Sequence, residues 1–340
     1  MKLLFTLDYE LFLGSKTGRV EACLIQPLNS YIEAAADYGV RFTIFVDAAY
    51  LYVLKKYAAK YECLKKDYHI VEQHLLMLQA AGHDIQLHIH PQWYFSTFDG
   101  KEWLLDTQHY KLSDVHKEEM NHYMLESKLL LDKMIGKRTV AFRAGGFSAQ
   151  PTSLLTALME ENGLLVDSSV CPGSHYSSPY QHYDYRHASR KGMYRFEQDI
   201  CHEEEEGRFW EVPISMYEVS PFFQWKLLFH RLIPKIVGNS RHAVYGDGRS
   251  VRTTRGSIIR RLLMPCHTMA TIDGYKISFL KEAMKSCRKH GKEVMCILGH
   301  PKLATPYSVE KISDICDYAR HRGYEFYTLT ELIKEKQNSI

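Results

Sequence analysis

Apolar segments of the length of buried strands alternate along this chain with segments that have the hydrophobic pattern of helices. Strands are predicted at 2–7, 40–46, within 82–91, and at 139–142, 209–213, 293–298 and 324–327. Helices are predicted between them, for example at 28–38, 113–134 and 309–322. Strands that alternate with helices in this way predict a parallel sheet. A chain of 340 residues is long enough for two domains or for one large α/β barrel.

Polar side chains gather where the predicted strands end. They are Asp8 and Glu10, His88 and His90, Arg143, Asp167, and His300. Charge at the end of a core strand costs free energy unless it has a partner or a use. In a β/α barrel the carboxyl ends of the strands share one face, which is the usual place for an active site. The pattern therefore indicates an enzyme.

The stretch 82–91 (GHDIQLHIHP) carries three histidines. Successive side chains of a strand alternate between its faces, so His88 and His90 are expected on one side, about 7 Å apart at Cα. Two imidazoles at that spacing can share one metal ion at about 2.0–2.1 Å each. Pro91 cannot donate to a sheet, so the strand is expected to end there and to leave both rings at its mouth.

Composition narrows the class of protein. With 45% hydrophobic and 12% aromatic residues the chain is globular, and its formal charge of +3 implies no polyanionic partner. No apolar run approaches the 18 residues of a membrane span, and the one at the N-terminus is cut short by Asp8. The eight cysteines show no Cys-x-x-Cys pair and are expected to be reduced. We expect a cytoplasmic protein, and no motif indicates nucleic-acid binding.

Taken in order, the strand-end segments resemble the motifs of the polysaccharide deacetylase (NodB-homology, carbohydrate esterase 4) family. The matching segments are 6–10 (TLDYE), 82–88 (GHDIQLH), 142–148 (FRAGGFS), 167–169 (DSS) with 210–213 (WEVP), and 298–301 (LGHP). Those at 167–169 and 210–213 are similar to members of the family in exopolysaccharide biosynthesis. The resemblance implies a distorted (β/α)7 barrel that forms a single catalytic domain over 1–340. It also implies metal-dependent removal of an acetyl group from a sugar.

The resemblance further assigns roles to four of these residues. It implies that Asp8 is the general base and that Glu10, His88 and His90 hold a divalent metal, with zinc as the expected ion. The first motif of the family usually has two adjacent aspartates, whereas here one residue separates Asp8 from Glu10. The reverse assignment, with Asp8 as ligand and Glu10 as base, therefore stays open.

Two more residues receive roles from the same resemblance. His300 is expected to protonate the leaving amine, a task suited to a side chain that titrates near neutrality. Arg143 is expected to keep Asp8 ionised, because a neighbouring positive charge lowers the pKa of a carboxyl group. For Asp167 we expect no more than a supporting role.

The sequence departs from the family pattern at two places. The family histidines are usually separated by three residues, but a single residue separates His88 from His90, and Gly145 stands where a proline is usual. Altered metal geometry and an inactive site both stay open. The leading hypothesis is a deacetylase that acts on an acetylated, N-acetyl amino sugar in bacterial O-antigen or exopolysaccharide assembly. The alternatives are a metal-dependent hydrolase of a non-sugar amide and a metal-less carbohydrate-binding homologue.

One segment lies outside the family motifs, a basic insertion at about 214–272. Nine Lys or Arg residues but a single acid, Asp247, lie between Lys226 and Arg261. An ordinary basic surface is one interpretation of this segment. The other is contact, through Arg252 and Arg255, with an anionic sugar carrier or with an anionic membrane face.

Overall fold

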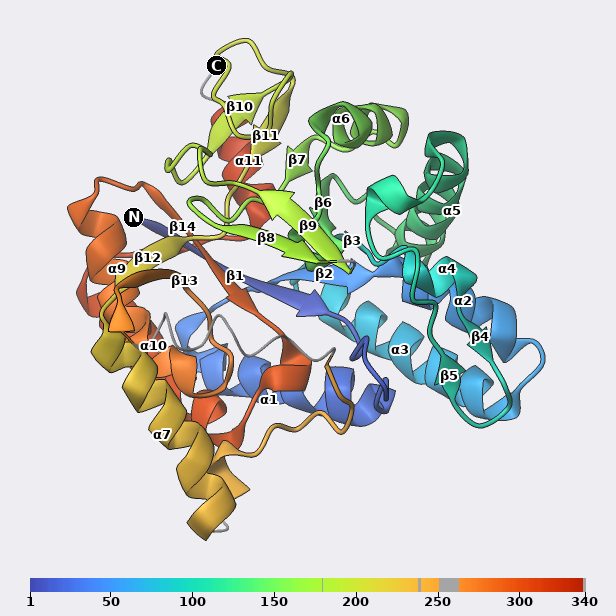
Figure 1. The fold of residues 1–340 in the computed structure, drawn as a ribbon, viewed down its shortest axis with the longest axis horizontal. Helices are drawn as coiled ribbons and strands as arrows, with labels where there is room; N and C mark the ends of the chain where they lie inside the picture. Colours follow the sequence, from blue (N-terminus) through green and yellow to red (C-terminus); the bar gives the residue numbers. More distant parts are fainter. Residues whose placement is uncertain (179, 238–239, 251–262, 339–340) are drawn as a thin grey trace. The chain divides into compact units, whose positions relative to one another are not determined.

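The computed structural model describes residues 1–178, 180–237, 240–250 and 263–338 (Figure 1). The chain divides into two compact units, each described here by itself. The first unit contains Met1–Val40 and Ser215–Tyr327, and the second contains Arg41–Ile214 and Thr328–Ile340. The single catalytic domain expected from the sequence stays a prediction.

The second unit is built on a sheet of six strands in the order β10-β11-β7-β6-β3-β2. All neighbours in it are parallel except β10 and β11. The strands are β2 (Thr43–Asp47), β3 (Asp84–Ile89), β6 (Ala141–Ala144), β7 (Val166–Asp167), β10 (Tyr194–Phe196) and β11 (Phe209–Glu211). Every residue of β2, β3, β6 and β7 is buried, so these strands form the core of the unit.

Helices connect these strands, as the alternating pattern predicts. They are α2 (Ala48–Ala58), α3 (Glu62–Ala80), α4 (Gln92–Phe95), α5 (Lys117–Ile135) and α6 (Thr152–Glu161), with the 3-10 helices η3 (Leu112–Asp114) and η4 (Gly145–Phe147). The unit also includes the last helix of the chain, α11 (Leu329–Gln337). Two small hairpins lie in the loops, β4 (Thr97–Phe98) with β5 (Trp103–Leu104) and β8 (His175–Ser178) with β9 (Gln181–Asp184).

The first unit is built around β1 (Lys2–Tyr9), which pairs in parallel with β14 (Val294–Gly299) and β15 (Glu325–Phe326). Its helices are α1 (Gln26–Ala35), α7 (Pro221–Val237), α9 (Leu280–Lys289) and α10 (Pro306–His321). Shorter helical turns are η1 (Glu21–Ile25), η2 (Ala36–Tyr38), η5 (Ser240–His242), η6 (Gly274–Phe279) and η7 (Pro301–Leu303). A hairpin of β12 (Met216–Val219) and β13 (Cys266–Met269) completes the unit.

The signals that set strand and helix ends act as predicted. β3 ends at Ile89, and Pro91 directly precedes α4. The helical segment of α1 and η2 stops at Tyr38, before Gly39, which has the left-handed φ of 63° that glycine adopts without strain. Thr328 caps α11 by accepting a hydrogen bond from the backbone N–H of Glu331. β1 is longer than expected and runs through Tyr9, so Asp8 belongs to the strand itself.

The described helices include none that is long and apolar enough to cross a membrane.

Candidate active site

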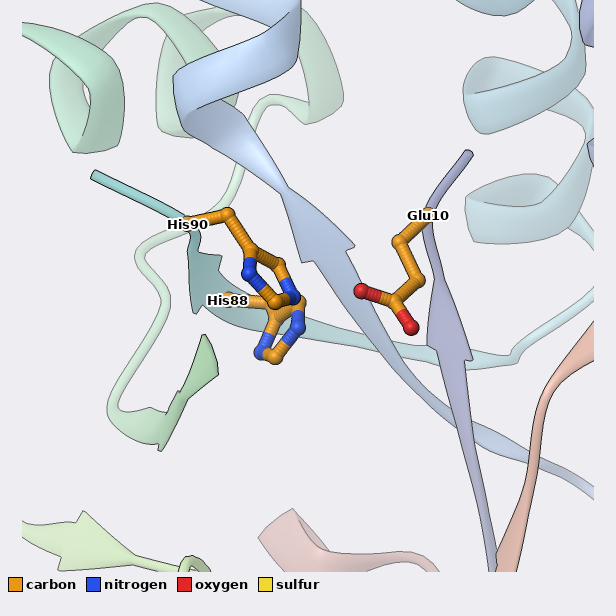
Figure 2. Close-up of side chains that lie close together, drawn as sticks. All are labelled: Glu10, His88 and His90. Carbon is orange, nitrogen blue, oxygen red and sulfur yellow. The ribbon is translucent and has the colours of Figure 1, made fainter. Parts of the chain in front are cut away.

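The carboxyl end of β3 carries the two histidines of the stretch 82–91. His88 is the fifth residue of the strand and His90 follows its end, and both are buried. Their rings meet edge to face with centroids 4.8 Å apart (Figure 2). The strand therefore brings the two imidazoles together, as the alternation of side chains along it predicts.

The ring of His88 is fixed by the neighbouring strand β6. Its Nδ1 atom lies 2.8 Å from the backbone carbonyl oxygen of Arg143, the residue that pairs with His88 across the sheet. A carbonyl oxygen can only accept, so Nδ1 carries the hydrogen and the neutral ring presents Nε2 as its lone-pair atom. Metal-binding histidines are typically oriented by such a hydrogen bond on their other nitrogen.

His90 is held by a buried carboxylate at the end of β2. The backbone N–H of His90 donates to Oδ1 of Asp47 at 3.3 Å, and the indole Nε1 of Trp93 donates to Oδ2 of Asp47 at 2.9 Å. Our sequence analysis missed Asp47 and Trp93. Asp47 could have been found, because it follows the apolar segment 40–46 just as Asp8 follows 2–7.

The ring of His90 also lies against Gly145. A Cβ atom at residue 145 would come 2.6 Å from Nδ1 of His90 and 2.6 Å from the carbonyl oxygen of Ile89. Both distances are shorter than real Cβ contacts, so Gly145 is required here by the close approach of the histidine. The sequence identified this position only as a departure from a motif.

Arg143 is fully buried, and its described side-chain contacts lie within the second unit. Its Nε donates to the carbonyl oxygen of Ser168 at 2.8 Å, and its Nη2 donates to the Ser168 hydroxyl at 2.9 Å. The guanidinium lies 4.1 Å from the ring centre of Phe45. The expected action of Arg143 on Asp8 stays a prediction.

Asp167 is fully buried at the end of β7, the strand that follows Arg143 and β6 along the chain. Its carboxylate accepts from the backbone N–H of Ser169 at 2.7 Å and from the Ser169 hydroxyl at 2.9 Å. Burial raises the pKa of Asp167 to about 6, against the lowering effects of the Glu211 side chain, Ser169 and Arg143. Glu211 is the residue of β11 that pairs with Asp167 of β7, so two fully buried carboxyl groups lie on neighbouring strands.

In the first unit, His300 follows the end of β14 and faces two carboxylates. Its Nε2 atom lies 3.7 Å from Oδ2 of Asp8 and 3.7 Å from Oε1 of Glu10. Its Nδ1 atom lies 2.9 Å from Oδ2 of Asp273. The other carboxylate oxygen, Oδ1 of Asp273, accepts from the His300 backbone N–H at 2.7 Å. Three of the sequence-predicted residues thus come together, and Asp273, which the sequence analysis missed, orients the imidazole.

These carboxylates set the charge of His300. Burial lowers the pKa of the imidazole, but Asp273, Asp8 and Glu10 outweigh burial and raise the pKa above its usual value. The arrangement therefore favours the imidazolium, with Nδ1–H directed at Asp273 and Nε2–H directed toward the two carboxylates. Such a group can donate a proton at neutral pH.

Glu10 has a second partner that the sequence did not reveal. Nζ of Lys302, a buried residue in η7, lies 2.9 Å from Oε1 of Glu10 and 2.7 Å from the carbonyl oxygen of Leu11. The ammonium is also 5.1 Å from the ring centre of Phe12. Lys302 therefore fixes one oxygen of the Glu10 carboxylate and compensates its charge.

One group of three side chains among the described residues could hold a metal ion, namely Glu10, His88 and His90. Each of the three residues is buried and offers one ligand atom (Figure 2). Two imidazole nitrogens and one carboxylate oxygen are the donor set of many catalytic zinc sites, which keep a further position open. The chemistry of the residues fits a catalytic divalent metal. Asp8 is not in the group.

The basic insertion is described only in part. Arg252 and Arg255 lie outside the described residues. Asp247, the single acid of 226–261, accepts from the backbone N–H and from Nε of Arg19, both at 2.9 Å, and lies 3.6 Å from Nζ of Lys16.

Comparison with known proteins shows likeness in structure only. No family model matches the chain, and no curated protein matches its sequence. A crystal structure from Mycobacterium smegmatis, provisionally assigned as a polysaccharide deacetylase, matches with 13% identity and a TM-score of 0.53, over 99% of this chain and 90% of that one. The structure of PuuE allantoinase matches with 13% identity and a TM-score of 0.50, over 98% and 88%.

A family 4 carbohydrate esterase from Streptomyces lividans also matches, with 10% identity and a TM-score of 0.40, over 96% of this chain and 92% of that one. At 13% identity the likeness to the mycobacterial structure shows the fold. The predicted α/β fold of the NodB/polysaccharide deacetylase type is confirmed.

We expect Gly145→Ala to lower zinc affinity at least tenfold, because the new Cβ would displace the ring of His90. The measurement is isothermal titration calorimetry of the metal-free protein with zinc. Gly207→Ala is a matched control, since its Cβ would meet the backbone of Phe196 at 2.6 Å. Both variants should lose about 1–3 kcal/mol of stability through overpacking. Equal zinc affinity in the two variants would contradict the assignment of Gly145.

The raised pKa of Asp167 predicts a pH-dependent stability. A carboxyl group with a pKa of about 6 in the folded state and 3.8 in the unfolded state stabilises the fold only while protonated. Its contribution should fall by at most about 3 kcal/mol as the pH rises from about 4 to about 6. Asp167→Asn, which cannot ionise, should lack this fall in urea unfolding measured across that range. Parallel stability curves for the two proteins would show that the prediction is wrong.

We expect Lys302→Met to lower the free energy of unfolding of the metal-free protein by about 3 kcal/mol, because the buried Glu10 carboxylate loses its hydrogen-bonded cation and keeps only His300, at 3.7 Å. Glu10→Gln in the same background should recover much of this loss. A double-mutant cycle by urea unfolding measures the coupling, which we expect to exceed about 1 kcal/mol. Additive effects of the two substitutions would mean that the ion pair does not stabilise the fold.

Proposed function

We propose that this chain is a metal-dependent hydrolase that removes an acetyl group from an acetylated sugar. The observation that carries the proposal is the group of Glu10, His88 and His90, a donor set suited to a catalytic metal. The fold shared with the mycobacterial structure is consistent with it. An N-acetyl amino sugar of a bacterial surface-polysaccharide precursor, O-antigen or exopolysaccharide, is the substrate that we propose from the sequence resemblance. We propose that the reaction takes place in the cytoplasm, before export.

In this proposal Glu10, His88 and His90 hold the metal, with zinc as the expected ion. Such an ion, when bound, supplies Lewis-acid chemistry that activates water and polarises a carbonyl group. The hydrogen bond from Nδ1 of His88 to the Arg143 carbonyl leaves Nε2 as the ligand atom. The presence of Glu10, and not Asp8, in the group favours Glu10 as ligand and Asp8 as base.

Asp8 and His300 would move the protons of the reaction. Asp8 is a buried carboxylate at the end of β1, and we propose that it takes a proton from the attacking water. His300 would give a proton to the leaving amine nitrogen, for which the raised pKa of its imidazole is suited. Asp273 holds that imidazole in place through Nδ1, so the proton to be donated sits on Nε2, on the side of Asp8.

In this proposal the backbone and the side chain of Arg143 have different roles. Its backbone carbonyl orients His88, and Ser168 holds its guanidinium. We retain the hypothesis that its charge also keeps Asp8 ionised. An anionic carrier of the sugar, such as a nucleotide or a lipid diphosphate, is proposed to contact the basic insertion through Arg252 and Arg255.

A second function is favoured by one observation. PuuE allantoinase shares the fold at a TM-score of 0.50 and the same 13% identity as the mycobacterial structure. A metal site on this fold therefore also suits hydrolysis of a non-sugar amide. Release of acetate from acetylated sugars is expected for the first function and not for the second, so this assay distinguishes them.

We expect the purified protein to contain about one zinc-like ion per chain, measured by mass spectrometry of its metals. His88→Ala and Glu10→Ala should lose the ion, because each removes one of three ligands. His182→Ala, an exposed histidine outside the group, is the matched control and should keep it. Failure to retain metal after reconstitution with zinc would favour the metal-less binding protein.

Asp8→Asn should keep the metal and lose at least about a hundredfold in turnover, because the amide cannot accept the proton. The assay is acetate release from N-acetyl amino sugars and their nucleotide-linked forms, with allantoin as the non-sugar amide. A deacetylase that keeps its turnover after Asp8→Asn would overturn the role of Asp8. Turnover of allantoin without any release of acetate would establish the second function instead.

A further inference from the structure

The helix α7 exposes a row of aromatic side chains on its outer face. Phe222, Trp225 and Phe229 are 66%, 43% and 58% exposed. Their spacing of three and four residues places them on one face of a helix. The opposite face packs onto the unit, where the ring of the buried Phe223 lies 4.2 Å from that of Phe279. α7 is therefore fixed by one apolar face and presents a second one to solvent.

Two further apolar side chains lie at the start of this helix. Leu263 and Met264 are exposed and lie three and two residues before the start of β13. Because Val219 pairs with Cys266, the hairpin brings the chain before β13 to the end of β12, from which α7 begins. Five large apolar side chains are thus exposed in one region, and contiguous apolar surface of this kind marks an interaction site.

The charge of α7 has one sign. No acidic residue occurs in 219–246, which includes the whole of α7. Lys226 is exposed on the aromatic face, with its Nζ 4.8 Å from the ring centre of Phe222. The one acid among the nine basic residues of 226–261 is Asp247, whose carboxylate is engaged by Arg19 and Lys16. The outer face of α7 is thus apolar and carries the positive charge of Lys226 beside its aromatic rings.

We propose that α7 is an anchor that lies in the plane of an anionic lipid bilayer. Aromatic side chains with neighbouring Lys or Arg are the features that bind a helix to the interface of such a bilayer. At about 1.5 Å per residue its 17 residues extend about 25 Å, less than a span of about 20 residues needs. α7 therefore lies on the bilayer. The anchor is independent of the reaction proposed above.

Two other occupants fit this surface less well. A second copy of the chain would bring two basic segments of the same sign together, which costs free energy. A sugar nucleotide carries negative charge but offers little apolar surface to cover the three aromatic rings. A bilayer that contains anionic lipid satisfies both properties at once, because it takes up aromatic side chains and attracts positive charge.

The test is flotation of the full chain with vesicles of phosphatidylcholine alone and with roughly one third phosphatidylglycerol. We expect binding to the anionic vesicles, weakened by high salt. Replacement of Phe222, Trp225 and Phe229 together by serine should lower the partition coefficient at least tenfold, because the three aromatic rings would no longer be buried in the bilayer. Leu125→Ser with Leu129→Ser, two exposed positions on α5, is the matched control and should not change it.

Quenching of tryptophan fluorescence by brominated lipid measures whether α7 itself enters the bilayer. We expect quenching in the native chain and its loss in Trp225→Phe, which keeps the apolar face. Lys226→Glu should weaken binding to anionic vesicles only. The proposal is overturned if the triple serine variant binds vesicles like the native chain. It is also overturned if the aromatic face instead mediates dimerisation, or if sugar nucleotides bind to it while anionic vesicles do not.

Discussion

The structure depends on burying charged and polar side chains at the ends of parallel strands. Each of these groups would cost several kcal/mol without a partner, so each needs one that is held in place by the fold. The partners are frequently backbone groups of the next strand. His88 uses the carbonyl of Arg143, and Asp47 accepts from the backbone N–H of His90.

Parallel register explains why these groups gather. Asp47, His88 and Arg143 occupy one row across β2, β3 and β6, and Asp167 pairs with Glu211 on β7 and β11. The sequence contains none of these pairings directly. It shows only that several apolar segments end at a polar residue. The parallel register then places an acidic, an imidazole and a basic side chain in one row, at Asp47, His88 and Arg143.

The sequence was sufficient to place His90, Glu10 and His300 directly after core strands. It was insufficient for their partners, because those come from loops far away in the chain. Lys302 is 292 residues from Glu10, and nothing in the segment around it distinguishes it from a surface lysine. Asp273 lies in a loop ahead of η6, where its burial against His300 cannot be read from local pattern. The fold class was predictable because strand–helix alternation is local.

The two departures from the family motifs have one physical cause. The short spacing between His88 and His90 puts the second imidazole directly beyond the strand, against residue 145. Any side chain at that residue, a proline ring included, would place its Cβ 2.6 Å from the His90 ring, so only glycine is compatible with this histidine. The glycine therefore compensates for the shortened spacing. The metal site proposed above would need this glycine, because only a residue without a Cβ lets the His90 ring keep its place beside His88.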